Sequence, residues 1–106
     1  MLKVISKNAE VTGTHLQGRI TTSYDKLVEV FGEPTYNDND PRDKVQVEWA
    51  LKFSDGTVAT IYNWKDYDDG SRCKQALHYD WHIGGMNYDA VMNVYELAEE
   101  EVYYGA

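Results

Sequence analysis

The chain has few residues of the kind that hold small proteins together by covalent or metal bonds. Cys73 is the single cysteine among 106 residues, which excludes an internal disulfide and a zinc site built from several thiolates. No apolar run approaches the roughly 18 residues of a membrane-spanning helix. The first residues also lack the long apolar stretch of a signal peptide. We therefore expect a soluble, intracellular protein with a single domain, residues 1–106.

Positive charge is missing from the last third of the chain. All ten Lys and Arg residues lie before residue 75, whereas six of the 18 acidic residues follow it. Because nucleic-acid binding requires clustered cations, we expect no direct contact with nucleic acid in this third. An acidic surface either keeps a small protein soluble or binds a basic partner. The candidate protein-binding residues are Glu96, Glu99, Glu100, Glu101, Tyr103 and Tyr104.

Aromatic residues, in contrast, are abundant, with nine Tyr and three Trp against two Phe. They offer more amphipathic aromatic surface than one small core hides, and aromatic side chains left on a surface are typical of interfaces. Since two-fold dimers are the commonest closed assembly, the composition favours a homodimer. Its contact would involve an aromatic strand edge or the terminal pair Tyr103 and Tyr104.

Apolar spacing predicts two helices. The first spans residues 22–31, with Thr22 as its cap and Gly32 as its stop. The second begins at Asn87 and carries Asp89 in its first turn, where a negative charge favours the helix dipole. Alternating apolar residues predict strands over residues 45–53, 57–65 and 77–83, and residues 11–21 form a less regular first strand.

The order β-α-β-β-β-α predicts an α+β fold, because a meander of neighbouring strands cannot be all parallel. We expect an antiparallel sheet of three to four strands with two helices on one face. The stretches 35–43 and 66–72 are rich in turn-forming residues and are predicted to be loops. The residues predicted to be buried are Val47, Trp49, Leu51, Tyr79, Trp81 and Val94.

Catalytic and metal-binding patterns are weak. His78, Asp80 and His82 alternate on one strand face, but this spacing is common and lacks the four ligands of a structural zinc site. Arg72 and Lys74 flank Cys73 in a predicted loop, where cations lower a thiol pKa, yet no nucleophile motif surrounds it. We therefore expect an exposed thiol without a catalytic role, and no enzyme activity, cofactor or metal.

Three segments combine an aromatic or histidine side chain with an amide, a lysine or glycines: residues 13–18, 61–65 and 81–85. If the strands that carry them pair, they form a site that stacks a base on aromatic rings and hydrogen-bonds its edge. A well-packed sheet with polar edges would explain the same residues. The candidate ligand-binding residues are His15, Gln17, Tyr62, Asn63, Trp64, Lys65, Trp81 and His82.

The same segments carry a resemblance. Residues 13–18 (GTHLQG), 31–34 (FGEP), 55–65 (DGTVATIYNWK) and 81–85 (WHIGG) resemble a family of small proteins from tailed-bacteriophage genomes, over roughly residues 12–95. The resemblance implies a phage origin and a location in the cytoplasm of a bacterial host. It implies no catalytic residue, and the acidic tail lies outside it.

Two hypotheses about function follow. In the first, the protein is a noncatalytic inhibitor, similar to an anti-CRISPR protein, whose acidic third binds the basic surface of a host defence or nucleic-acid-handling complex. In the second, it sequesters a nucleotide that carries a host immune signal, using the aromatic and amide residues above. A metal-dependent enzyme ranks below both.

Overall fold

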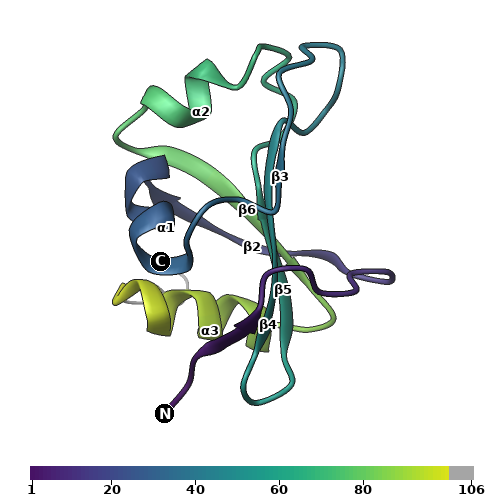
Figure 1. Cartoon of the computed structure of the whole chain (residues 1–106), viewed down its shortest axis with the longest axis vertical. Helices are drawn as coiled ribbons and strands as arrows, with labels where there is room; N and C mark the ends of the chain where they lie inside the picture. The colour runs from purple at the N-terminus through teal and green to yellow at the C-terminus, as the bar shows by residue number, and fades with distance from the viewer. Residues whose placement is uncertain (101–106) are drawn as a thin grey trace.

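The computed structural model describes residues 1–100, whose strands form one antiparallel sheet (Figure 1). The strands are β1 (Val4–Ser6), β2 (His15–Thr22), β3 (Tyr36–Asn37), β4 (Val47–Phe53), β5 (Val58–Tyr62) and β6 (Tyr79–Gly85). They are arranged in the order β1-β4-β5-β6-β2. The short strand β3 pairs with β4 at Glu48 and Val47, and β1 pairs with the other end of β4 at Lys52 and Phe53.

Three helices lie on one face of this sheet: α1 (Tyr24–Phe31), α2 (Ser71–Gln75) and α3 (Asp89–Ala98) (Figure 1). The apolar core fills the space between helices and sheet, with Leu27 and Phe31 from α1 and Val91 and Val94 from α3. Within residues 1–100, no helix covers the opposite face of the sheet. We call that side of the sheet the open face.

The sequence predicts the fold class correctly and the number of elements wrongly. The fold is α+β, but it has six strands rather than three or four and three helices rather than two. Strands β1 and β3 are too short for alternation to show. Helix α2 begins at the end of the stretch 66–72, which was expected to form a loop, and continues beyond it. All six residues predicted to be buried are buried.

Helix α1 also begins later than its predicted cap. Ser23 is the N-cap, and its Oγ accepts a hydrogen bond from the Lys26 amide at 3.0 Å. Thr22 is instead the last residue of β2. The predicted stop is confirmed, because Gly32 ends the helix with a φ of 83°, a conformation that favours glycine.

Two tryptophans hold α1 onto the sheet by both of its ends. Trp81 donates its indole N–H to the Thr22 carbonyl just before the helix, at 3.1 Å. Trp49 donates to the Gly32 carbonyl just after it, at 2.8 Å. The two rings meet edge to face with centroids 5.5 Å apart, a favourable arrangement of aromatic quadrupoles. Both side chains are fully buried. Their rings pack in the apolar core, and each indole N–H still has a hydrogen-bond acceptor.

Helix α3 packs so closely that two of its contacts require glycine. A Cβ built on Gly18 would lie 2.9 Å from Val91 Cγ2, and one built on Gly85 would lie 2.3 Å from Ala90 Cβ. Real Cβ atoms do not approach other atoms this closely. A residue with a side chain at either position would therefore push α3 away from β2 or β6.

Removing the ring at the centre of the core should be costly. We expect Trp49→Ala to lower the free energy of unfolding by about 3–5 kcal/mol, as large-to-small changes at buried aromatic positions do. Urea denaturation measures this change. Leu77→Ala is the control, because Leu77 is 76% exposed and should change stability by less than about 0.5 kcal/mol. Equal effects of the two substitutions would contradict the assigned core.

Candidate functional site

The open face is built by the residues that alternate with the core positions of the three central strands. Strand β4 contributes Glu48 between the buried Val47 and Trp49, and the register places it opposite Tyr62 of β5. Tyr62 in turn lies opposite His82 of β6. Opposite residues on neighbouring strands share a face, so these three side chains lie in a row across the sheet.

Three rings form what we call the open-face aromatic cluster: Tyr62, Trp64 and His82. Tyr62 meets Trp64 edge to face at a centroid distance of 6.0 Å and meets His82 in the same way at 5.5 Å. His82 lies nearly parallel to Trp64, with 28° between the planes and 6.1 Å between the centroids. Burial is the main cause that lowers the pKa of His82, followed by the nearby Arg19 charge, which favours a neutral ring.

Two lysines lie over the ring of Trp64. The ammonium nitrogen of Lys65 is 5.5 Å from the ring centroid and that of Lys44 is 5.9 Å from it, both within cation–π range. The Lys65 amide donates to the Lys44 carbonyl at 2.8 Å, which ties the two segments together. Lys65 has a φ of 56°, a left-handed conformation that costs a non-glycine residue about 1–2 kcal/mol. Strain of this kind is concentrated at functional sites.

A cavity of about 240 Å³ adjoins the cluster on the open face. Its lining residues are Val11, Thr14, His15, Leu16, Val45, Glu48, Thr60, Tyr62, Trp64 and Gly84. Gly84 keeps the floor of the cavity low, since a Cβ there would lie 2.5 Å from Thr60 Oγ1 and 3.6 Å from Tyr62 Cε1. The cavity is therefore bounded by apolar side chains, two aromatic rings and a few polar groups, which is the usual make-up of a small-molecule site.

Glu48 is the charged residue inside this cavity. Its side chain is half-buried and makes no hydrogen bond or ion pair with any of residues 1–100. Burial raises the pKa of the Glu48 carboxyl, and burial together with the Glu48 charge raises the pKa of Tyr62. Half-buried carboxylates are costly without a partner, so the site has an unused hydrogen-bond acceptor.

The structure brings together five of the eight residues predicted to bind a ligand. His15, Tyr62 and Trp64 line the cavity, and Lys65 and His82 adjoin Trp64. Trp64 is 39% exposed, so part of its side chain is accessible from solvent.

The other three predicted residues have different roles. Trp81 and Asn63 are fully buried in the layer that faces the helices, which removes them from the open face. Gln17 occupies a bulge in β2 and donates its side-chain amide to the Gly85 carbonyl at 3.0 Å. None of the three lines the cavity.

Asn63 positions the site from behind, because its amide group makes four hydrogen bonds. Its oxygen accepts from the backbone N–H of Gln46 at 2.8 Å and from the backbone N–H of Val47 at 3.0 Å. Its nitrogen donates to Gln46 Oε1 at 2.7 Å and to Asp66 Oδ2 at 3.2 Å. Asp66 accepts from the Tyr79 hydroxyl at 2.7 Å, which extends the network to β6. Trp64 and Lys65 lie between Asn63 and Asp66, so the network fixes both ends of their segment.

Eight residues of the site were not among the predicted ligand-binding residues: Val11, Thr14, Leu16, Lys44, Val45, Glu48, Thr60 and Gly84. Glu48 and Thr60 are the polar members of alternating strands, where such residues are ordinarily only solvated. Pairing β4 with β5 through the turn at Ser54-Asp55-Gly56 would have placed Glu48 opposite Tyr62. The register of the β4–β5 hairpin is therefore the sequence signal that could have identified Glu48 as a site residue.

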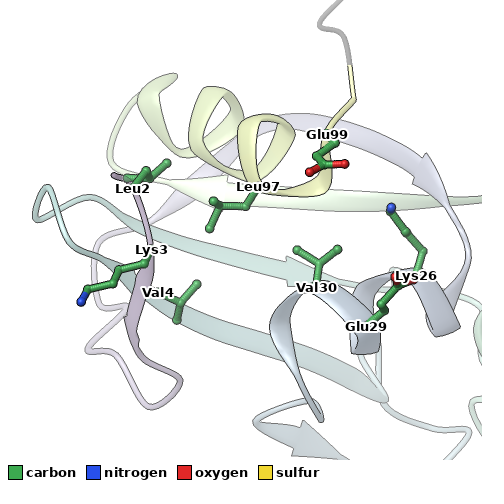
Figure 2. A pocket seen from close by; sticks show the side chains of 8 residues that line it. All are labelled: Leu2, Lys3, Val4, Lys26, Glu29, Val30, Leu97 and Glu99. Atoms are coloured by element: carbon green, nitrogen blue, oxygen red, sulfur yellow. The ribbon is translucent and has the colours of Figure 1, made fainter.

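The acidic residues predicted to bind a partner are at the end of α3. Glu96, Glu99 and Glu100 are exposed, whereas Glu101, Tyr103 and Tyr104 lie outside the described residues. Glu99 also lines a hollow between the N-terminal segment, α1 and the end of α3 (Figure 2). Its volume is about 430 Å³. Leu2, Val4, Val30 and Leu97 give it apolar walls. Its charged lining residues are Lys3, Lys26, Glu29 and Glu99.

The expected exposure of Cys73 is wrong. Cys73 lies on α2, is fully buried, and donates its thiol to the Gly70 carbonyl at 3.3 Å. Burial raises its pKa to about 12, and the charges of Asp66 and Asp68 add to the rise. The flanking cations cannot offset this burial, so the thiol stays protonated and unreactive.

The alternating histidines do not form a metal site in the part of the chain described. Within residues 1–100, no group of three or more His, Cys, Asp or Glu side chains is arranged to hold a metal ion. His78 is exposed just before β6, and Asp80 instead pairs with Arg19 at 3.5 Å.

Comparison with protein-family models, with curated proteins and with solved structures gives no significant match. Among residues 1–100, none of the helices has the length and apolar character needed to span a membrane. The assignment of a function therefore depends on the open face and on the acidic end of α3.

Removing the Asn63 amide should loosen the fold around the site. We expect Asn63→Ala to lower the free energy of unfolding by at least about 2 kcal/mol, because each buried donor left without a partner costs about 1–3 kcal/mol. Chemical denaturation measures the loss. Asn39→Ala is the matched control, since Asn39 is exposed and its side chain makes no hydrogen bond to any of residues 1–100. A loss no larger than that of the control would show that the network is not important.

The Cys73 thiol should be inert in the folded protein. At about pH 8.5 an ordinary thiol is half ionised and reacts readily with an aromatic disulfide reagent. With a pKa of about 12, Cys73 should react at least about a hundredfold more slowly in the native protein than after unfolding in urea. Similar rates in the two states would mean that α2 is not packed as described.

Proposed function

We propose that this protein is a noncatalytic binding protein that captures a nucleotide on the open face of its sheet. The observation that carries the proposal is the cavity beside the open-face aromatic cluster, with the ammonium groups of Lys44 and Lys65 over the Trp64 ring. A nucleotide combines a flat aromatic base with an anionic phosphate. The site has aromatic rings that complement the base and, beside them, lysine ammonium groups that complement the phosphate.

The individual contacts fit this class of ligand. Aromatic side chains stack with bases of any sequence, and lysine is a common partner of phosphate. The cavity of about 240 Å³ is smaller than most small-molecule sites, which favours one base over a dinucleotide. His82 carries a lowered pKa and contributes its ring as a neutral surface.

Binding without catalysis is favoured by the polar groups of the cavity. Within residues 1–100, no cavity side chain is hydrogen-bonded to another in the way that a nucleophile is bonded to its base. Thr14 donates instead to the Val11 carbonyl at 2.8 Å. The resemblance to tailed-phage proteins suggests a purpose for capture, which is to remove a nucleotide signal of the bacterial host's defence.

Loss of the stacking ring or of its lysine should weaken nucleotide binding. We expect Trp64→Ala to weaken binding of nucleoside monophosphates by about 5- to 150-fold, because stacking on an aromatic ring contributes about 1–3 kcal/mol per base. Lys65→Ala should weaken binding and reduce its dependence on salt. Isothermal titration calorimetry measures both effects.

Lys52→Ala is the control for the charge change. Lys52 is an exposed lysine of β4 that does not line the cavity. It should leave the affinity unchanged. If the three variants and the unaltered protein bind a panel of linear and cyclic nucleotides equally weakly, the proposal fails.

A second candidate function is supported by the acidic end of α3. Glu29 and Glu99 line the hollow of Figure 2, and Glu96 and Glu100 are exposed near Glu99 at the end of α3. The hollow itself is lined by Lys3 and Lys26 as well as by Glu29 and Glu99, so the acidic character comes from the end of α3 beside it. An acidic helix end next to an apolar depression complements a basic protein surface that presents an apolar side chain. This surface would let the protein inhibit a host defence or nucleic-acid-handling complex by occupying a basic groove.

Charge reversal tests this second candidate. Glu96→Lys, Glu99→Lys and Glu100→Lys together should slow association with such a complex more than they speed its dissociation, because exposed charges mainly steer encounter. Surface plasmon resonance at two salt concentrations measures the rates. The matched control is Glu10→Lys, an exposed acidic residue away from the hollow. If the association rate of the triple variant is unchanged, the acidic residues have no role in binding and only keep the protein soluble.

A further inference from the structure

Glu48 is the feature of the cavity that stacking and phosphate binding leave unexplained. Its carboxylate is half-buried, lines the cavity and makes no hydrogen bond or ion pair with any of residues 1–100. Burial is the cause that raises its pKa, so no nearby cation offsets the cost of desolvation. A ligand that brings hydrogen-bond donors to this carboxylate would recover that cost.

An ionised carboxylate accepts hydrogen bonds and cannot donate them. Two adjacent donors bind it best, because they use both oxygens in parallel. Among the common bases, guanine alone presents two adjacent N–H donors on its Watson–Crick edge, from N1 and from the 2-amino group. Adenine and cytosine present one amino group beside an acceptor, and uracil presents one N–H between two carbonyls.

Guanidinium groups offer the same pair of donors, but the site disfavours them. Lys44 and Lys65 place two positive charges at the Trp64 ring, which is the ring that an arginine side chain would otherwise use. Like charges repel a cationic ligand and attract an anionic one. The lysines therefore favour guanine attached to phosphate over an arginine side chain.

The positions along the sheet agree with one ligand reaching all of these groups. Glu48 and Tyr62 are opposite each other, and Lys44 and Lys65 follow at the same end of the β4–β5 pair, joined by the Lys65-to-Lys44 backbone hydrogen bond. Lys44 is four positions before Glu48, and bends at Lys44 and Gln46 keep the two closer than the roughly 13 Å of four extended residues. The Lys44 side chain reaches the Trp64 ring, which also lines the cavity of Glu48, so the ammonium group and the carboxylate can contact opposite ends of one nucleotide.

We infer that the cavity selects a guanine nucleotide, with the Glu48 carboxylate accepting hydrogen bonds from N1–H and the 2-amino group of the base. This inference rests on the proposed function and adds the identity of the base. Tyr62 and Trp64 hold the ring, and Lys44 and Lys65 hold the phosphate.

Calorimetric titration of the full chain with three nucleotides tests the inference: guanosine, inosine and adenosine monophosphate. Inosine monophosphate lacks only the 2-amino group. Guanosine monophosphate should bind at least about tenfold more tightly than either of the others, as expected for a second hydrogen bond to a charged acceptor. Glu48→Gln should remove this preference, because its amide replaces one of the two acceptor oxygens with a donor. Glu29→Gln, on α1, is the control and should keep the preference.

The possible failures are distinguishable. Equal binding of the three nucleotides overturns the guanine inference and leaves nucleotide capture standing. A guanine preference that survives in Glu48→Gln also overturns it, since another group would then recognise the base. No binding of any nucleotide at millimolar concentration overturns both proposals. Binding of N-acetylarginine amide that depends on Glu48, in the absence of nucleotide binding, assigns the carboxylate to a guanidinium ligand instead.

Discussion

The side-chain amide of Asn63 is the interaction on which the ligand site depends. It satisfies two backbone N–H groups at the start of β4, the side chain of Gln46 and the carboxylate of Asp66. Gln46 in turn donates to the carbonyls of Asp40 and Asp43 at 3.0 and 2.7 Å. A loop, two strand ends and the segment of Trp64 are therefore held by a fully satisfied polar network. Networks of this kind specify one arrangement, because any alternative leaves buried groups unpaired.

The fold separates two kinds of surface that the net charge of −8 conceals. The helical side carries exposed acidic residues, with Asp25 and Glu29 on α1 and Glu96, Glu99 and Glu100 at the end of α3. The open face carries lysines beside its aromatic rings. A protein of strongly acidic composition can thus present a cationic site for an anion. The net charge is a sum over the helical side and the open face, and it does not describe the charge of either surface by itself.

The sequence was most informative where one face of a strand is buried. Alternation located β4, β5 and β6 and the six core residues, because burial imposes a period of two on such strands. It failed where polar residues are buried. Asn63 and Gln46 have the residue types of a surface, and only the pairing between distant segments shows that they are satisfied inside. Cys73 was misplaced for a related reason, since its charged neighbours point outward from a helix too short to show a period.

At the adjacent glycines Gly84 and Gly85, near the end of β6, the strand consists of backbone alone and has no side chain on either face. Gly84 forms the floor of the cavity on one side, and Gly85 receives Ala90 of α3 on the other, with no room for a Cβ at either position. Neither side can acquire a new side chain there without displacing a helix or filling the cavity. Evolutionary change of ligand preference must then come from the margin of the cavity, at residues such as Thr14, Leu16 and Val45, while the floor stays fixed.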